Sequence, residues 1–216
     1  MKGELNMKTL SALEREIATT LVEALVEYGL NSHLEPYGIR GAENWFFDND
    51  MNRFGFGASG GASKICIWHD DLANWVIKVG YTYGVKMDYA AKEYENYCLA
   101  EEAGLAFYFP QTIYLGEFGG RPFYLQEWAE CDTNQVSSEW YERLRDQYDE
   151  EGEEYDCDSL WDEIECMDDD QKAFLTFGDN ELCHFLWDNH IGDLHEGNFG
   201  YIGSRMVIVD FSGWRG

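Results

Sequence analysis

The residues best suited to chemistry lie in the segment HIGDLHEGNFGYIGSRMVIVDFSG, at positions 190–213. Asp193 and Asn198 share a stretch rich in Gly and Asn, which favours a loop over a regular helix or strand. Residues 206–209 are apolar and mostly β-branched, which predicts a short buried strand, and Asp210 follows directly. Two carboxylates and a carboxamide converging on one cleft would favour a cation between them, and ligation by oxygen alone suits Mg²⁺. The segment therefore predicts phosphate transfer assisted by a metal ion.

A second group of residues upstream could bind the phosphates themselves. Gly55, Gly57 and Gly60 form a GxGxxG pattern between two predicted strands, although a glycine doublet at its end leaves the register open by one residue. Glycine lets the backbone approach a phosphate closely because it has no Cβ. The apolar strand predicted over residues 74–80 contains Lys78, a buried cation that needs an anionic partner. A flexible hairpin and a surface lysine on an edge strand are the alternative interpretations.

Together these motifs resemble those of the protein-kinase-like superfamily. DLHEGN is similar to the DLxxxN catalytic loop, and VDFSG is similar to the metal-binding DFG segment. The DLHxxN form is closer to aminoglycoside-phosphotransferase-like kinases than to ordinary protein kinases. The resemblance covers about residues 53–213. It implies an α+β, two-lobed kinase-like fold, with a small antiparallel sheet and one helix followed by a truncated helical lobe.

The resemblance also implies a role for each matching residue. Asp193 would orient or deprotonate the acceptor hydroxyl, while Asn198 and Asp210 would hold Mg²⁺. Lys78 would position the phosphates of ATP, and the glycines at positions 55, 57 and 60 would cover the nucleotide.

The partner of Lys78 is expected on a helix over residues 88–103, whose apolar side ends before a glycine. Glu93 and Glu95 are the two candidates on this helix. We choose Glu93, because it adjoins the apolar side and because its position resembles that of the glutamate in the family.

Two further strands, over residues 111–118 and 121–130, are expected to form a hairpin. The second resembles the strand that enters the hinge between kinase lobes. The resemblance therefore implies that backbone groups of Glu127 and Ala129 contact the adenine ring. An ordinary β-hairpin is the alternative.

The flanking elements can also be placed. Ser11 and Glu14 form a capping-box pattern at the start of a long amphipathic helix, and a shorter helix is expected over residues 180–189. Residues 31–53 look like a connector. We expect residues 1–130 to contain the amino-terminal helix and the first lobe, and residues 131–216 to contain an acidic helical insert and the reduced second lobe.

Composition limits the partners of this 216-residue chain. The formal net charge of −27 argues against direct binding of nucleic acid or of anionic membranes. The opening residues lack a signal peptide, and no apolar run is long enough to span a bilayer, so we expect a cytoplasmic protein. The 6 cysteines and 5 histidines are scattered, which argues against a transition-metal site.

Residues 131–170 are rich in Asp and Glu, with only Arg143 and Arg145 as basic residues. Such a run is usually a solvated face, but its spaced aromatic residues could also anchor a basic partner. The sequence as a whole predicts an ATP- and Mg²⁺-dependent phosphotransferase acting on a small molecule or an atypical acceptor. The alternatives are a nucleotide-binding pseudokinase and an acidic module that binds a basic protein.

Overall fold

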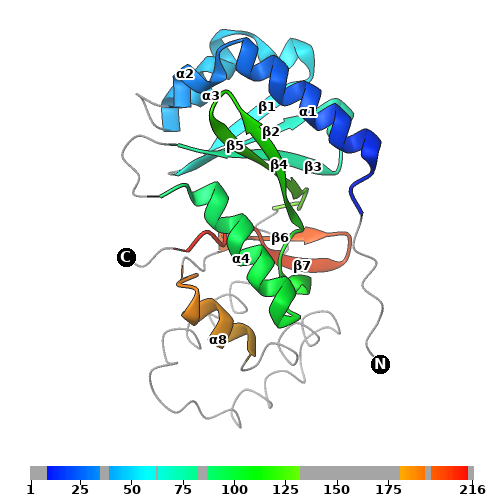
Figure 1. Cartoon of the computed structure of the whole chain (residues 1–216), viewed down its shortest axis with the longest axis vertical. Coiled ribbons are helices and arrows are strands. Elements are labelled where there is room, and N and C mark those ends of the chain that lie inside the picture. The colour runs from blue at the N-terminus through cyan, green and yellow to red at the C-terminus, as the bar shows by residue number, and fades with distance from the viewer. Residues whose placement is uncertain are drawn as a thin grey trace. The chain divides into compact units, whose positions relative to one another are not determined.

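The computed structural model describes residues 9–34, 39–61, 63–81, 87–131, 181–192 and 196–213. The chain divides into two compact units (Figure 1). The first contains Met1–Tyr97 and Gln111–Trp128, and the second contains Cys98–Pro110 and Ala129–Gly216. This division differs from the predicted boundary at residue 130, because residues 98–110 group with the second unit.

The first unit is built on a five-stranded antiparallel sheet with the order β1-β2-β3-β5-β4. The strands are β1 (Phe56–Gly60), β2 (Lys64–His69), β3 (Trp75–Gly80), β4 (Thr112–Phe118) and β5 (Arg121–Glu127). The 3-10 helix η2 (Asp70–Leu72) connects β2 to β3. The predicted α+β class and the antiparallel arrangement of its sheet are therefore confirmed.

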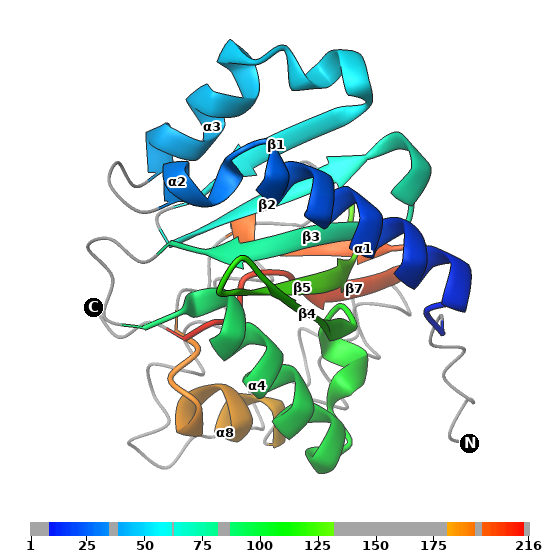
Figure 2. The same ribbon diagram turned by 45° about the horizontal axis from the view of Figure 1, so that its top comes forward.

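Helices cover one face of this sheet (Figures 1 and 2). They are α1 (Ala12–Glu27), α2 (Leu30–Leu34), α3 (Ile39–Asp48) and the 3-10 helix η1 (Met51–Phe54). The predicted capping box begins α1, since Ser11 Oγ accepts from the Glu14 amide and Glu14 Oε2 accepts from the Ser11 amide. Residues 31–53, predicted to be a connector, instead supply most of α2, α3 and η1. The reason is that Leu34, Ala42 and Trp45 join the hydrophobic core.

The two faces of the sheet differ because successive side chains of a strand point to opposite sides. Ile65 and Ile67 of β2, with Ile77 and Val79 of β3, are buried in the core beneath α1 to α3. Lys64 and Cys66 alternate with the isoleucines of β2, and Lys78 lies between Ile77 and Val79. The lysines therefore belong to the face of the sheet opposite the hydrophobic core.

Helix α4 (Tyr89–Ala103) follows β3 after a short connection. Asp88 caps it, because Oδ1 of this residue accepts hydrogen bonds from the amides of Ala90 and Ala91 at 2.9 and 3.0 Å. The helix ends before Gly104, which has a φ of 77°, a backbone conformation that glycine adopts easily. Its residues up to Tyr97 belong to the first unit.

The described part of the second unit contains a hairpin and several short helical elements. These are η3 (Ala106–Tyr108), α8 (Glu181–Asp188), η4 (Glu196–Asn198), β6 (Phe199–Ile202) and β7 (Arg205–Ile208). Phe109 packs against Phe185 and Phe211, with ring centroids 5.7 and 4.8 Å apart. Arg205 of β7 donates to the carbonyls of Phe107 and Phe109, which ties the hairpin to η3.

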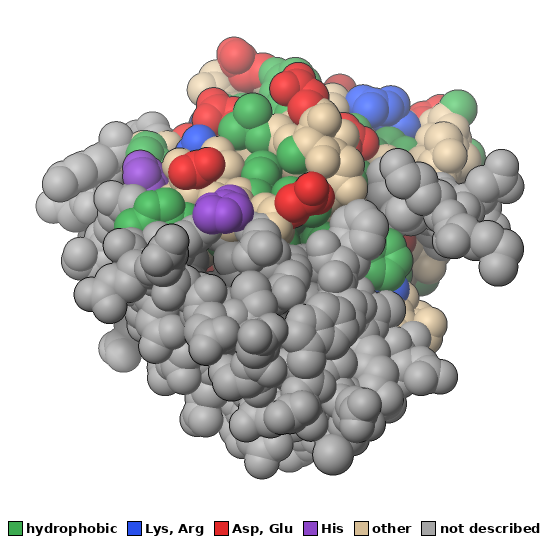
Figure 3. Space-filling model, turned by 90° about the horizontal axis from the view of Figure 1, so that it is seen from below, with side chains coloured by type: hydrophobic (Ala, Val, Ile, Leu, Met, Phe, Trp, Pro, Cys, Tyr) green, Lys and Arg blue, Asp and Glu red, His purple; other side chains and the backbone are tan. Residues whose placement is uncertain are grey.

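Surface charge and helix hydrophobicity are the two features of the structure that relate to the predicted partners. Several acidic side chains lie among hydrophobic ones on the described part of the face in Figure 3. Among the residues with described structure, no helix combines the length and the apolar character needed to cross a bilayer.

Candidate functional site

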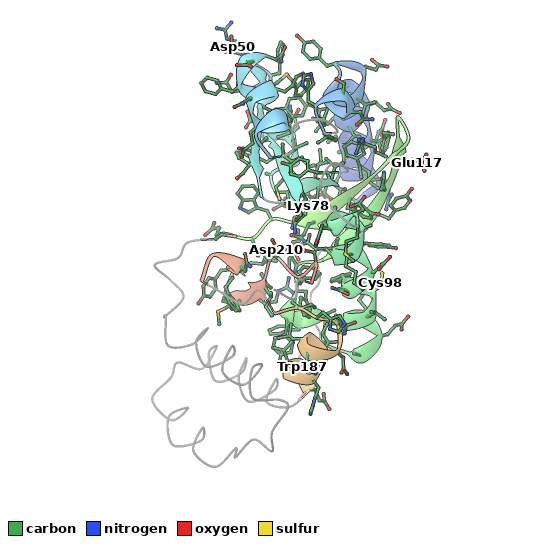
Figure 4. All side chains as sticks on the ribbon, turned by 90° about the vertical axis from the view of Figure 1, so that its left-hand side faces the viewer. Asp50, Lys78, Cys98, Glu117, Trp187 and Asp210 are labelled. Carbon is green, nitrogen blue, oxygen red and sulfur yellow. The ribbon has the colours of Figure 1, made fainter. Side chains whose placement is uncertain are left out.

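Lys78 and Glu93 form a buried ion pair in the first unit. Lys78 extends from the middle of β3 (Figure 4), and its Nζ lies 2.8 Å from Oε2 of Glu93 on α4. The side chains are 5% and 0% exposed. The prediction that Lys78 has an anionic partner on this helix is confirmed. Glu93 is that partner, whereas Glu95 is largely exposed and pairs with Lys92 at 3.6 Å.

A second lysine contacts the same carboxylate. Nζ of Lys64 lies 3.2 Å from Oε1 of Glu93, and the side chain of Lys64 is 6% exposed. The sequence pattern indicates only one buried lysine, Lys78, and does not predict Lys64. The available signal was the alternation in KICIWH, which places Lys64 on the same face as Cys66, the cross-strand neighbour of Lys78.

Neutral polar side chains complete the surroundings of Glu93. Nε2 of Gln126 lies 3.5 Å from Glu93 Oε2 and donates to Thr112 Oγ1 at 3.1 Å. Both Gln126 and Thr112 are buried. The carboxylate is thus held by β2, β3 and β5 at once, which fixes the position of α4 on the sheet.

Tyr124 extends this polar face beside Lys78, its cross-strand neighbour in β5. Burial, and after it the negative charge of Asp88, raises the pKa of the Tyr124 phenol. The phenol therefore stays neutral at physiological pH and adds no negative charge beside Lys78.

The glycine pattern occupies a strand and does not form a loop. Gly55 precedes β1, while Gly57 and Gly60 lie inside it, and the chain reverses only after Gly60. This corrects the prediction of a glycine loop between two strands. The physical reason is packing, because a Cβ at Gly57 would overlap the indole of Trp68, and one at Gly60 would approach the hydroxyl of Tyr81 to 2.7 Å.

The predicted hinge residues, Glu127 and Ala129, each form a hydrogen bond within the fold through a backbone group. The amide of Glu127 donates to the carbonyl of Gln111 at 2.8 Å, so it continues the pairing of β5 with the chain before β4. The amide proton of Glu127 is therefore committed within the fold. The contact of backbone groups of Glu127 and Ala129 with adenine stays a prediction. Ala129 belongs to the second unit, where its carbonyl accepts from Cys131 Sγ at 3.6 Å.

In the second unit, Asn198 and Asp210 flank the open end of the β6-β7 hairpin. Phe199 pairs with Ile208, and the amide of Val209 donates to the carbonyl of Asn198 at 2.9 Å. Asn198 is 7% exposed, and Oδ1 of Asp210 accepts from Ser212 Oγ at 3.1 Å. The strand predicted before Asp210 is present as β7, which ends one residue earlier than the predicted run. The hairpin thus brings both residues to the same end.

Asp193, the third member of this predicted group, lies outside the described residues. Within the described ranges, no group of three or more His, Cys, Asp or Glu side chains could hold a metal ion. The oxygen donors of Asn198 and Asp210 nevertheless have the chemistry that Mg²⁺ prefers, because this ion commonly binds through one or two protein oxygens plus substrate phosphates.

The described residues suited to phosphate chemistry belong to both units. Lys64, Lys78 and Glu93 lie in the first, and Asn198 and Asp210 lie in the second. No protein-family model matches the chain, and a search of curated proteins finds no sequence similar to it.

Proposed function

We propose that the protein binds ATP with Mg²⁺ and transfers a phosphoryl group to a hydroxyl of a small molecule or an atypical acceptor. The observation that carries this proposal is the buried contact between Lys78 and Glu93. A strand lysine paired with a helix glutamate is the arrangement by which kinase-like proteins hold nucleotide phosphates. A five-stranded antiparallel sheet and a helix that supplies the glutamate also support a kinase-like first lobe.

The energetics of burial favour a functional role for this pair. A buried ion pair contributes little to stability, since desolvating both charges offsets their attraction. An apolar pair of similar size would fill the same space at no greater cost. A lysine held in this way is therefore better explained by a ligand that requires its charge.

Asn198 and Asp210 would hold the metal ion. Both present oxygen atoms, and the hairpin register brings both to one end of β6 and β7. The bound ion would neutralise negative charge on the phosphates as the phosphoryl group is transferred.

In the transfer itself, the acceptor oxygen would form a bond to the γ-phosphorus. The bond from that phosphorus to the bridging oxygen would break, and ADP would leave. Asp193 would orient the acceptor hydroxyl and accept its proton. This role comes from the DLHEGN motif alone.

Calorimetric titration with a non-hydrolysable ATP analogue tests the binding step. We expect binding that depends on Mg²⁺ and that is lost in the variants Lys78→Ala and Asp210→Asn. Lys92→Ala is the matched control, because Lys92 carries the same charge on α4 but pairs with the exposed Glu95. Saturation at 100 times the dissociation constant should also stabilise the wild type by about 2.7 kcal/mol.

Equal affinity in the wild type and in both site variants would contradict the proposal. Binding without turnover on any acceptor would instead support a pseudokinase. Binding and phosphate transfer are therefore measured separately.

A further inference from the structure

The carboxylate of Glu93 connects two buried ammonium groups through different oxygen atoms. Oε1 faces Lys64 at 3.2 Å, and Oε2 faces Lys78 at 2.8 Å. The three side chains are at most 6% exposed. Lys64 and Lys78 are thus held side by side by one carboxylate, that of Glu93.

The strand register explains how the lysines come together. Lys64 is opposite Gly80, and Cys66 is opposite Lys78, so the lysines are diagonal neighbours on one face of β2 and β3. Gly80 contributes no side chain between them. Glu93 reaches this face from α4, whose start is fixed by the cap at Asp88.

Lys64 adds a second positive charge beside the single carboxylate of Glu93. Lys78 already forms a close ion pair with this carboxylate, and Gln126 approaches the same oxygen. Burying another ammonium group costs several kcal/mol before its interactions are counted. Two like charges side by side also repel each other. A ligand with adjacent negative groups would gain from both lysines, because each phosphate oxygen could meet a separate ammonium group.

We propose that Lys64 is a second phosphate-binding residue, placed beside Lys78 by the shared carboxylate of Glu93. This inference rests on the proposed function and specifies that two lysines contact the phosphates of the nucleotide. The carboxylate of Glu93 already spans both ammonium groups, so a single phosphate group is large enough to contact both. The two lysines therefore favour a nucleotide over the uncharged nucleoside.

Titrations of ATP and of adenosine, each with Mg²⁺, against the wild type and Lys64→Gln test the inference. We expect Lys64→Gln to weaken ATP binding about tenfold or more, as for loss of a hydrogen bond to a charged group. Adenosine binding should change much less, because adenosine has no phosphate. Lys64→Arg, which keeps a positive charge, should recover most of the affinity for ATP, and Lys92→Gln should behave as the wild type.

Thermal melting of each variant verifies that it is folded. Lys64→Met serves if the glutamine variant does not fold, because an apolar side chain of similar length fills the same space while Glu93 keeps its ion pair with Lys78. A purely structural Lys64 would weaken the binding of ATP and of adenosine equally, or would weaken neither, and either result overturns the inference. If Lys64 proves to be structural but the wild type binds ATP, the proposed function stands. If the wild type binds no nucleotide, both the proposed function and the role of Lys64 are contradicted.

Discussion

Gly80 and Asp88 share one space at the junction between β3 and α4. A Cβ on Gly80 would overlap the carboxylate of Asp88, and that carboxylate caps α4 through the amides of Ala90 and Ala91. The absence of a side chain at the end of β3 is therefore a condition for starting the helix that carries Glu93.

The substitution Gly80→Ala should displace Asp88 and loosen the first turn of α4. We expect a loss of about 1–3 kcal/mol in the free energy of unfolding, the usual range for overpacking, measured by urea titration. Gly61→Ala is the control, because a Cβ there has no neighbour nearer than 3.8 Å. Equal stability of the two variants would show that Asp88 has another position from which it caps the helix.

Gly57→Ala should also destabilise the protein, and it should do so without any nucleotide. Gly57 pairs with Trp68 across β1 and β2, and the indole occupies the place of the missing side chain. The displaced indole should change the tryptophan fluorescence, because Trp68 lies in edge contact with Trp128 at 6.0 Å between ring centroids. We expect a loss of about 1–3 kcal/mol in the absence of ligand.

The opposite result for Gly57→Ala would be informative. Unchanged stability combined with weaker ATP binding would mean that this glycine serves the nucleotide, as the GxGxxG pattern predicts. The same urea titration and the same nucleotide titration distinguish the two roles.

These glycines illustrate where reasoning from the sequence fails. The spacing of Gly55, Gly57 and Gly60 predicts a phosphate-binding segment between two strands, or a flexible hairpin as the alternative. The pattern is ambiguous because glycine lacks a side chain both in a loop and in a crowded strand. Only the structure shows that the indole of Trp68 fills the space above Gly57. The need for glycine at position 57 thus comes from a side chain on the neighbouring strand, which the local sequence pattern does not reveal.

The ion pair of Lys78, in contrast, could be predicted from the local sequence. An apolar strand with one lysine requires an anionic partner, and the next helix offers only a few carboxylates on its inner side. The alternation in KICIWH places Lys64 on the same face as Cys66, but its closeness to Lys78 depends on the register between β2 and β3, which only the structure shows. The α+β class and the capping box of α1 follow from local patterns, and the structure confirms both.

Glu93→Gln and Glu95→Gln should differ sharply in stability. Glu93 is fully buried against two lysines, whereas the side chain of Glu95 is 63% exposed. Removing one member of a buried charge cluster typically costs about 3–5 kcal/mol, and an exposed pair is worth about 0–1 kcal/mol. Chemical denaturation of both variants measures the difference. A Glu93→Gln variant as stable as Glu95→Gln would mean that the lysines find equivalent partners elsewhere.

The final prediction concerns Asp193 and separates catalysis from binding. The DLHEGN motif places this carboxylate shortly before Asn198, so one segment would present both the group that accepts a proton and a metal ligand. Positioned proton transfer typically contributes about 10²–10⁴-fold to the rate. Asp193→Asn keeps the size and polarity of the side chain but removes its basicity. We therefore expect this variant to lose about that factor in phosphate transfer.

The affinity of Asp193→Asn for ATP should stay close to that of the wild type, because the proposed phosphate contacts come from Lys64 and Lys78. Turnover is measured as ATP hydrolysis and as phosphate incorporation across a panel of metabolites and proteins, and affinity is measured by calorimetry. Glu196→Gln, in the same motif, is the control for loss of a neighbouring charge. If phosphate transfer persists undiminished in Asp193→Asn, this carboxylate is not the proton acceptor, since no step that requires its basicity would limit the rate.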